Sequence, residues 1–224
     1  MLEAKKSAWF ETIFSIYNRN LLKRRFHSLE VSGLDFLREK NAGIPLIIYA
    51  NHSSWWDGLV ASEISKMAKL DSFIMMEEKQ LKNLFLFRKL GAFSVVRENP
   101  RKAVESINYA VNLLKKTDRT LWIFPQGEIL PNAARPLKFY NGLSRIIEKV
   151  GKVFVVPLAM RYEFLSEFKP QVFVKISSPE LFKNSKDFES KKMTEIMKSR
   201  LTNVLDELKT DIISKNFSNF ERII

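Results

Sequence analysis

The fold can be worked out from residues 49–58, which read YANHSSWWDG. The apolar run Ile44–Tyr49 leads into this stretch and predicts a buried strand. A polar turn follows, and it contains His52 and, five residues later, Asp57. In an open parallel sheet the carboxyl ends of the strands line the crevice where ligands bind. The stretch therefore predicts a central strand with a candidate site at its end.

Outward from this strand, short apolar runs alternate with segments of helical period. We expect further strands at Phe26–Val31, Ser72–Met76, Ala92–Val96, Arg119–Phe124, Val153–Pro157 and Gln171–Ile176. We expect helices at Glu3–Arg25, Leu34–Lys40, Asp57–Leu70, Leu81–Leu90, Pro100–Lys116, Gly142–Val150 and Lys186–Ser214. Ile129–Phe139 has two prolines and no clear period, which indicates a loop. The alternation predicts a single α/β domain with a mostly parallel central sheet flanked by helices.

The composition is that of a globular protein, because 46% of the 224 residues are hydrophobic and 28% are charged. The absence of cysteine excludes disulfides, thiolate zinc sites and cysteine nucleophiles. Lys and Arg number 37 against 25 Asp and Glu, which gives a formal charge of +12. This surplus favours an anionic partner, although a solvated basic surface would give the same count. No nucleic-acid-binding module is recognisable, so we expect lipid or a phosphorylated substrate rather than nucleic acid.

The N-terminal residues predict an amphipathic helix with basic residues at both ends. Its large apolar residues recur at helical spacing: Trp9, Phe10, Ile13, Phe14, Ile16, Tyr17, Leu21 and Leu22. Such a helix suits the plane of an anionic bilayer, but it could equally pack on the core. No apolar run reaches the roughly 20 residues of a membrane span, and charges interrupt any secretory signal. We therefore expect residues 1–25 to associate with a membrane from its cytoplasmic face, as part of a peripheral protein.

The spacing of His52 and Asp57 suits general-base chemistry. A neutral imidazole can take a proton from a hydroxyl near neutral pH, and a carboxylate that fixes its tautomer improves it as a base. The spacing alone also fits a structural histidine, and His27 has no such partner nearby. No nucleophile elbow of the Gly-x-Ser-x-Gly type is present, and two distant histidines make a metal site unconvincing. The pair is best suited to deprotonating a substrate hydroxyl or water.

An anionic substrate would need arginine, because the sequence has no glycine-rich phosphate loop. Arg97 is the best placed, since it follows the strand Ala92–Val96. Its guanidinium can bind a phosphate through two parallel hydrogen bonds. The alternative is a surface charge at the end of a strand.

These residues resemble the glycerolipid acyltransferase superfamily, which includes the lysophosphatidate acyltransferases. Residues 51–57, NHSSWWD, are similar to its His-x-x-x-x-Asp motif, and residues 91–97, GAFSVVR, to its second block. Residues 124–128, FPQGE, resemble the third block, usually FPEGT, and residues 155–158, VVPL, resemble the fourth. The four blocks occur in the family order over roughly Leu46–Ala159, which makes the match specific.

The resemblance implies acyl transfer from acyl-CoA or acyl carrier protein to a lipid hydroxyl, with no acyl-enzyme, cofactor or metal. His52 would be the base and Asp57 its orienting partner within an acyltransferase domain of residues 26–224. The acceptor would be bound by residues of the second and third blocks: Arg97, Phe124, Pro125, Gln126, Gly127 and Glu128.

The third block departs from the family pattern, because Gln126 replaces the usual Glu and Glu128 the common Thr. An acidic Glu128 would repel a phosphate unless Arg97 or Arg135 offsets it. The acceptor is therefore either a lysophospholipid such as 1-acylglycerol-3-phosphate or a lipid without phosphate, such as a glycolipid or glycosylated isoprenoid. A non-catalytic protein that binds anionic lipid is the remaining alternative.

Overall fold

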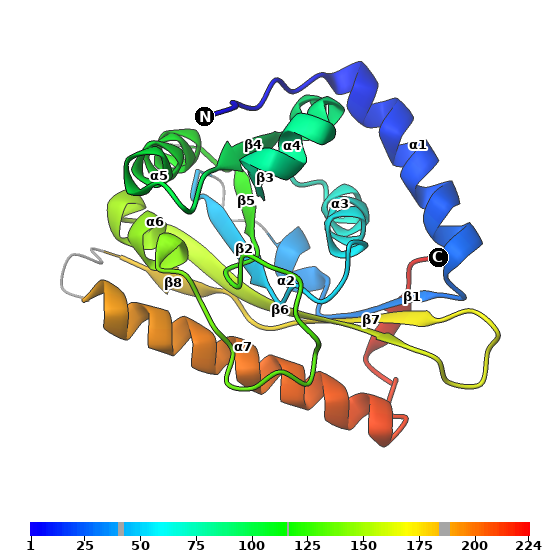
Figure 1. Cartoon of the computed structure of the whole chain (residues 1–224). Coiled ribbons are helices and arrows are strands. Elements are labelled where there is room, and N and C mark those ends of the chain that lie inside the picture. The colour runs from blue at the N-terminus through cyan, green and yellow to red at the C-terminus, as the bar shows by residue number, and fades with distance from the viewer. Residues whose placement is uncertain (40–42, 116, 184–188) are drawn as a thin grey trace.

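The computed structural model describes residues 1–39, 43–115, 117–183 and 189–224, so the predicted element ends at Lys40, Lys116 and Lys186 lie outside it. In these ranges nine strands form one sheet in the order β4-β3-β5-β2-β6-β7-β1-β9, with β8 paired to β6 (Figure 1). The strands are β1 (Leu29–Ser32), β2 (Leu46–Ala50), β3 (Ser72–Glu77), β4 (Ala92–Val95), β5 (Thr120–Ile123), β6 (Val153–Glu163), β7 (Gln171–Ile176), β8 (Glu180–Phe182) and β9 (Phe220–Arg222).

The sheet is mixed but mostly parallel, which confirms the predicted α/β fold. β2 pairs in parallel with β5 and β6, and β3 pairs in parallel with β4 and β5. β7 runs antiparallel to β6 and parallel to β1. β6 continues to Glu163, well beyond the predicted end at Pro157, and returns as β7 through a hairpin. β8 and β9 were not predicted, because strands of three residues are too short to show a period.

Helices cover both faces of the sheet, which explains why β2 reads as a continuous apolar run. Ile47 and Tyr49 point into one core, under α5 (Pro100–Leu114), α6 (Gly142–Val150) and α7 (Ser190–Ile213). Ile48 and Ala50 point into the other core, under α1 (Ala8–Arg25), α2 (Asp35–Arg38) and α3 (Asp57–Met67). Successive side chains of β2 therefore point alternately into the two cores on opposite faces of the sheet.

The apolar residues of α1 are divided between two faces. On the inner face Leu22 is buried, the Asn18 side chain donates to Leu59 O (3.0 Å), and Arg19 pairs with the buried Glu63 of α3. The other face carries an outer stripe of exposed residues, namely Trp9, Ile13, Ile16 and Tyr17. The inner face of α1 therefore packs on the core. That the outer stripe contacts a membrane remains a prediction.

The segment between β3 and β4 differs from the single helix predicted at Leu81–Leu90. It forms α4 (Glu78–Asn83) and a 3-10 helix, η1 (Phe85–Leu90). Gly91 ends η1 with a φ of +94°, as its predicted capping role requires, and a Cβ there would collide with Ser72 O. Among the helices of the described ranges, none has the length and apolar character needed to cross a bilayer.

Candidate active site

The candidate site lies where β2, β5 and β6 reach the same edge of the sheet. Residues 51–56 follow β2, the turn 124–128 follows β5, and the second half of β6 lies beside the loop that follows β2. Asn51 fastens the first loop to β6, because its side chain accepts from Met160 N (2.8 Å) and donates to Met160 O (2.9 Å). The loop therefore leaves the sheet in one fixed direction.

Asp57 is fully buried and is held by donors from three directions. Its Oδ2 accepts from the backbone N–H groups of Ser53 (2.7 Å) and Ser54 (2.9 Å) and lies 2.8 Å from His52 Nδ1. Its Oδ1 accepts from the Tyr162 hydroxyl (2.7 Å). A carboxylate accepts hydrogen bonds through both oxygens, and each of these partners can donate one.

The Asp57 contact assigns the proton of the His52 ring. Because Asp57 accepts at Nδ1, the neutral imidazole carries its proton there and leaves the Nε2 lone pair free to accept one. The ring stacks on Phe124 with centroids 4.6 Å apart, and His52 O accepts from Leu130 N (2.8 Å). His52 is thus held as a hydrogen-bond acceptor at the cavity described below, the arrangement a general base needs.

Tyr162 is the site residue that the sequence did not reveal. It lies on β6 beyond the predicted end of that strand, so nothing in the pattern placed it near Asp57. Burial raises the pKa of the Tyr162 hydroxyl well above its ordinary value, and the neighbouring Asp57 charge raises it further. The phenol therefore stays protonated and keeps donating to the carboxylate. The one available signal was the apolar run Leu158–Met160, which continues the strand beyond Pro157.

One residue of the turn 124–128 supports the His52 backbone, and the others line a cavity. Gln126 is only 3% exposed, and its Oε1 accepts from the His52 backbone N–H (2.8 Å). Its amide therefore positions the histidine from behind, and this role needs an acceptor but no charge. The other residues of the turn line the cavity: Phe124, Pro125, Gly127 and Glu128. Gly127 has a φ of +71°, which favours glycine.

Arg97 joins the ends of three strands rather than standing alone at a surface. Its guanidinium donates to Gly127 O, lies 3.5 Å from a carboxylate oxygen of Glu77 and stacks over the Tyr140 ring at 5.4 Å. Arg97 also lines the cavity. Arg135 was the other cation considered as an offset for Glu128, but it pairs with Asp206 of α7 (3.1 Å).

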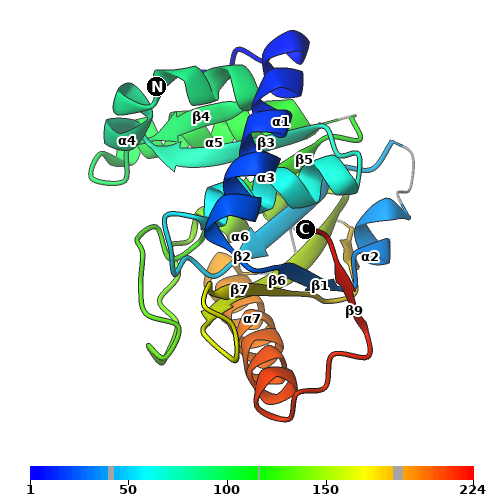
Figure 2. The ribbon, with the colours of Figure 1, turned by 90° about the vertical axis from the view of Figure 1, so that its right-hand side faces the viewer.

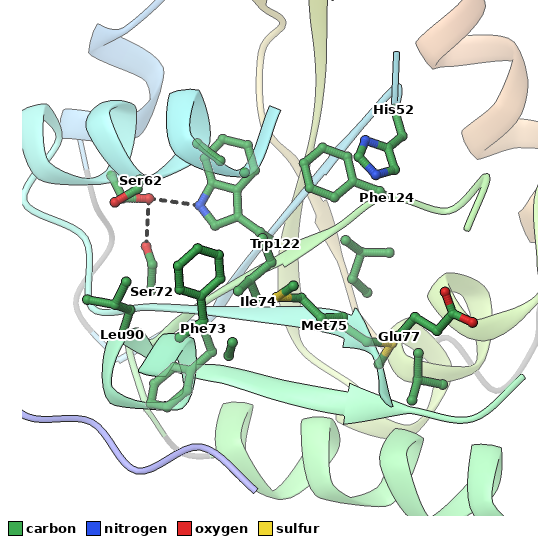
Figure 3. Close-up of a pocket in the computed structure, with 18 of the residues that line it drawn as sticks. His52, Ser62, Ser72, Phe73, Ile74, Met75, Glu77, Leu90, Trp122 and Phe124 are labelled. Carbon is green, nitrogen blue, oxygen red and sulfur yellow. Dashed lines mark hydrogen bonds between the residues drawn. The ribbon is translucent and has the colours of Figure 1, made fainter. Parts of the chain in front are cut away.

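A large, mainly apolar cavity of about 850 Å³ begins at these residues. Figure 3 shows His52 and Phe124 on one side of it and Leu90 and Ser72 on the far side, with Trp122 between them. Its walls come from α1, α3, β3 and η1 and are built largely of apolar side chains, including Leu59, Leu70, Phe73, Ile74, Met75 and Phe87. Within the described residues no cluster of three or more acidic or histidine ligands is placed to hold a metal. The cavity suits a long apolar chain whose reactive end lies at His52.

Comparison with known proteins agrees with this geometry. Residues 28–161, more than half of the chain, match the family model described as Acyltransferase. The chain belongs to the acyltransferase family. This confirms the resemblance and, at the level of the family, the prediction of an acyltransferase enzyme. The match includes the loop after β2, Arg97, the turn 124–128 and most of β6, and it leaves out α1 and α7.

One relative within this family is the 1-acyl-sn-glycerol-3-phosphate acyltransferase of Streptococcus pneumoniae (strain ATCC BAA-255 / R6). It is 34% identical over 116 residues, which make up 50% of this chain and 40% of that protein. The chain thus matches less than half the length of this curated relative.

Proposed function

We propose that this protein transfers a fatty acyl group from acyl-CoA or acyl carrier protein to the hydroxyl of a lysophospholipid such as 1-acylglycerol-3-phosphate. The observation that carries the proposal is the partly exposed His52, paired with the buried Asp57, at one end of a long apolar cavity. The name of the Streptococcus pneumoniae relative supports this acceptor. The protein would act at the cytoplasmic face of a membrane, with the outer stripe of α1 against anionic lipid.

In the proposed reaction His52 Nε2 takes the proton of the acceptor hydroxyl, and that oxygen attacks the thioester carbonyl carbon. The carbon–sulfur bond then breaks, and the leaving thiolate recovers the proton from the imidazolium. Asp57 stabilises the imidazolium while it exists, and its backbone donors and Tyr162 hold it in place. Direct transfer agrees with the contacts of His52, since within the described residues its ring hydrogen-bonds to Asp57 and not to a serine hydroxyl.

The acyl chain would occupy the cavity, where burial of methylene groups stabilises binding by about 0.8 kcal/mol each. Arg97 would bind the acceptor phosphate from its place beside Gly127. Pro125 and Phe124 would shape the wall, with Gly127 allowing close approach of the backbone. Glu128 is exposed at the cavity and would face the acceptor.

One observation favours a second acceptor class. Arg97 is already engaged by Glu77 and Gly127 O, and Glu128 adds a negative charge to the lining of the cavity. The engaged Arg97 and the negative charge of Glu128 elsewhere in the same cavity lining disfavour a dianionic phosphate and favour a lipid hydroxyl without one, such as a glycolipid or glycosylated isoprenoid.

The test is thiol release by the purified protein, with acyl-CoA and acyl carrier protein as donors and lysophosphatidate, other lysolipids and glycolipids as acceptors. His52→Ala is expected to lower turnover by about 10³-fold or more. His27→Ala, which changes the other histidine of the chain, is the control and should keep turnover close to that of the unaltered protein. Equal turnover in both variants would remove the mechanism, and no thiol release with any pair would leave the non-catalytic lipid-binding alternative.

A further inference from the structure

The hairpin between β6 and β7 ends in exposed aromatic side chains. Residues 164–169, FLSEFK, join the two strands at the edge of the molecule (Figure 1). Phe168 is 98% exposed, Phe164 is 72% exposed and Leu165 is 40% exposed. Single apolar residues are common on protein surfaces, but three within five residues at a protruding tip form a patch. We call residues 164–169 the hairpin tip.

The hairpin tip is fastened to the end of α1. His27 N donates to Pro170 O (2.9 Å), and His27 Nδ1 lies 3.5 Å from a carboxylate oxygen of Glu167. The Lys169 ammonium donates to Lys23 O (3.4 Å). The tip and the C-terminal end of α1 therefore hold a fixed relation, and both face the viewer in Figure 2.

The charges around the tip favour an anionic surface. Lys23, Arg24 and Arg25 are exposed at the end of α1, and Lys169 is exposed beside them. Glu167, the acidic residue of the tip, lies against His27. Aromatic side chains bordered by cations match the headgroup region of an acidic bilayer, where rings enter the interface and cations meet phosphates.

Aromatic contacts continue from the base of the hairpin to the candidate site. Tyr162 packs on Phe26 (5.7 Å between ring centroids), and Phe26 packs on Trp56 (5.1 Å). Trp56 in turn contacts the exposed Trp55, which lines the cavity. A surface that holds both the tip and α1 would thus reach one margin of the cavity.

We propose that the hairpin tip inserts into an anionic bilayer beside the outer stripe of α1, so that two separate elements dock the protein. The inference rests on the membrane-surface part of the proposed function and adds a second contact that sets the orientation. The margin of the cavity at Trp55 then faces the lipid from which an acceptor enters.

Vesicle sedimentation with the full chain tests the proposal. The vesicles contain equal parts of phosphatidylglycerol and phosphatidylcholine. Phe164→Ser combined with Phe168→Ser is expected to lower the ratio of bound to free protein about tenfold or more, since two aromatic rings no longer leave water. Val104→Ser is the control, because Val104 is an exposed apolar residue on α5, across the molecule from α1 in Figure 1. Equal sedimentation of the double variant and the unaltered protein would overturn the proposal.

A second measurement reports on the tip directly. The chain has no cysteine, so Phe168→Cys and Val104→Cys each accept one environment-sensitive fluorophore at a known position. Vesicles should shift the emission of the label at 168 to shorter wavelength and leave the label at 104 unchanged. Sedimentation without any shift at 168 would show that the tip stays in water when the protein binds vesicles, and the proposal would fail.

Both measurements stand apart from catalysis. The double variant keeps all the residues assigned to the reaction, so its turnover of a short-chain, water-soluble thioester should equal that of the unaltered protein. Loss of binding with intact turnover supports the inference. Absence of thiol release in all proteins would count against the proposed reaction, and the sedimentation result would still decide the role of the tip.

Discussion

The loop after β2 and the hairpin tip after β6 leave neighbouring parallel strands at the same edge of the sheet, yet they are built in opposite ways. In the loop, the side chains of Asn51, His52 and Asp57 each have hydrogen-bond partners within the protein. In the tip, Phe164 and Phe168 lie in water. The fold itself therefore fixes the polar side chains of the loop, whereas the aromatic side chains of the tip are free to be buried by an added environment. Changes in the loop should affect turnover, and changes in the tip should affect binding.

Asp57→Asn should produce the largest effect on turnover. An amide in place of the carboxylate cannot stabilise the imidazolium and can favour the wrong tautomer of His52, so kcat is expected to fall by roughly 10³–10⁴-fold. Thiol-release kinetics would measure this loss, with vesicle sedimentation as the control. A kcat within tenfold of the unaltered value would contradict the assigned role.

Arg19→Ala should produce a large effect on stability and little on chemistry. It removes the partner of Glu63, which is 2% exposed, and a hydrogen bond to Ile223 O (2.8 Å). The free energy of unfolding is expected to fall by about 2–3 kcal/mol, below the range for fully buried pairs because Arg19 is partly exposed. Denaturant titration measures this change in the free energy of unfolding. Adding Glu63→Gln should recover part of the loss, and no recovery would argue against a buried unpaired charge.

Tyr162→Phe should slow turnover about tenfold, which corresponds to the loss of one hydrogen bond to a charged group. KM is expected to change little, because Tyr162 acts through Asp57 and not on the substrate. Thiol-release kinetics measure kcat and KM separately. A higher KM with an unchanged kcat would contradict this positioning role, because Tyr162 would then act on substrate binding.

Phe168→Ser should produce the smallest effect on stability. In the absence of lipid the free energy of unfolding is expected to change by less than about 0.5 kcal/mol, because the ring is fully exposed. Phe26→Ser is the matched comparison, since Phe26 is 4% exposed and its loss should cost about 3–5 kcal/mol. Thermal unfolding compares the two. A clearly destabilised Phe168→Ser would show that the tip packs within the protein.

The sequence predicted those elements whose hydrophobic spacing and flanking turn residues indicate the same bounds. α6 and β7 begin and end at the predicted residues, and β2 lies within one or two residues of its predicted bounds. The α4–η1 break was missed, because a 3-10 helix shows nearly the same apolar spacing as an α-helix over so few residues. The extension of β6 was missed because its second half mixes buried and half-buried positions.

The candidate site was predictable as a set of strand ends but not as a set of contacts. Parallel pairing brings His52, Arg97 and the turn 124–128 to one edge, which the order of elements implies. Nothing in the sequence indicated that Gln126 holds the His52 backbone or that Tyr162 reaches Asp57. Such contacts depend on the register between strands distant in sequence. The roles of these residues in binding and catalysis remain predictions.

Residues of α1 form part of the cavity wall, which has a consequence for truncating the protein. Ala8, Thr12, Phe14 and Ser15 line the same cavity that begins at His52. Residues 1–25, predicted as a membrane-associating helix, therefore also supply part of the cavity wall. Truncation at residue 25 would remove these wall residues and open that side of the cavity to water. Under the proposed function, loss of activity in such a fragment would reflect the missing cavity wall, and exchange of this helix between relatives should change chain-length preference together with membrane affinity.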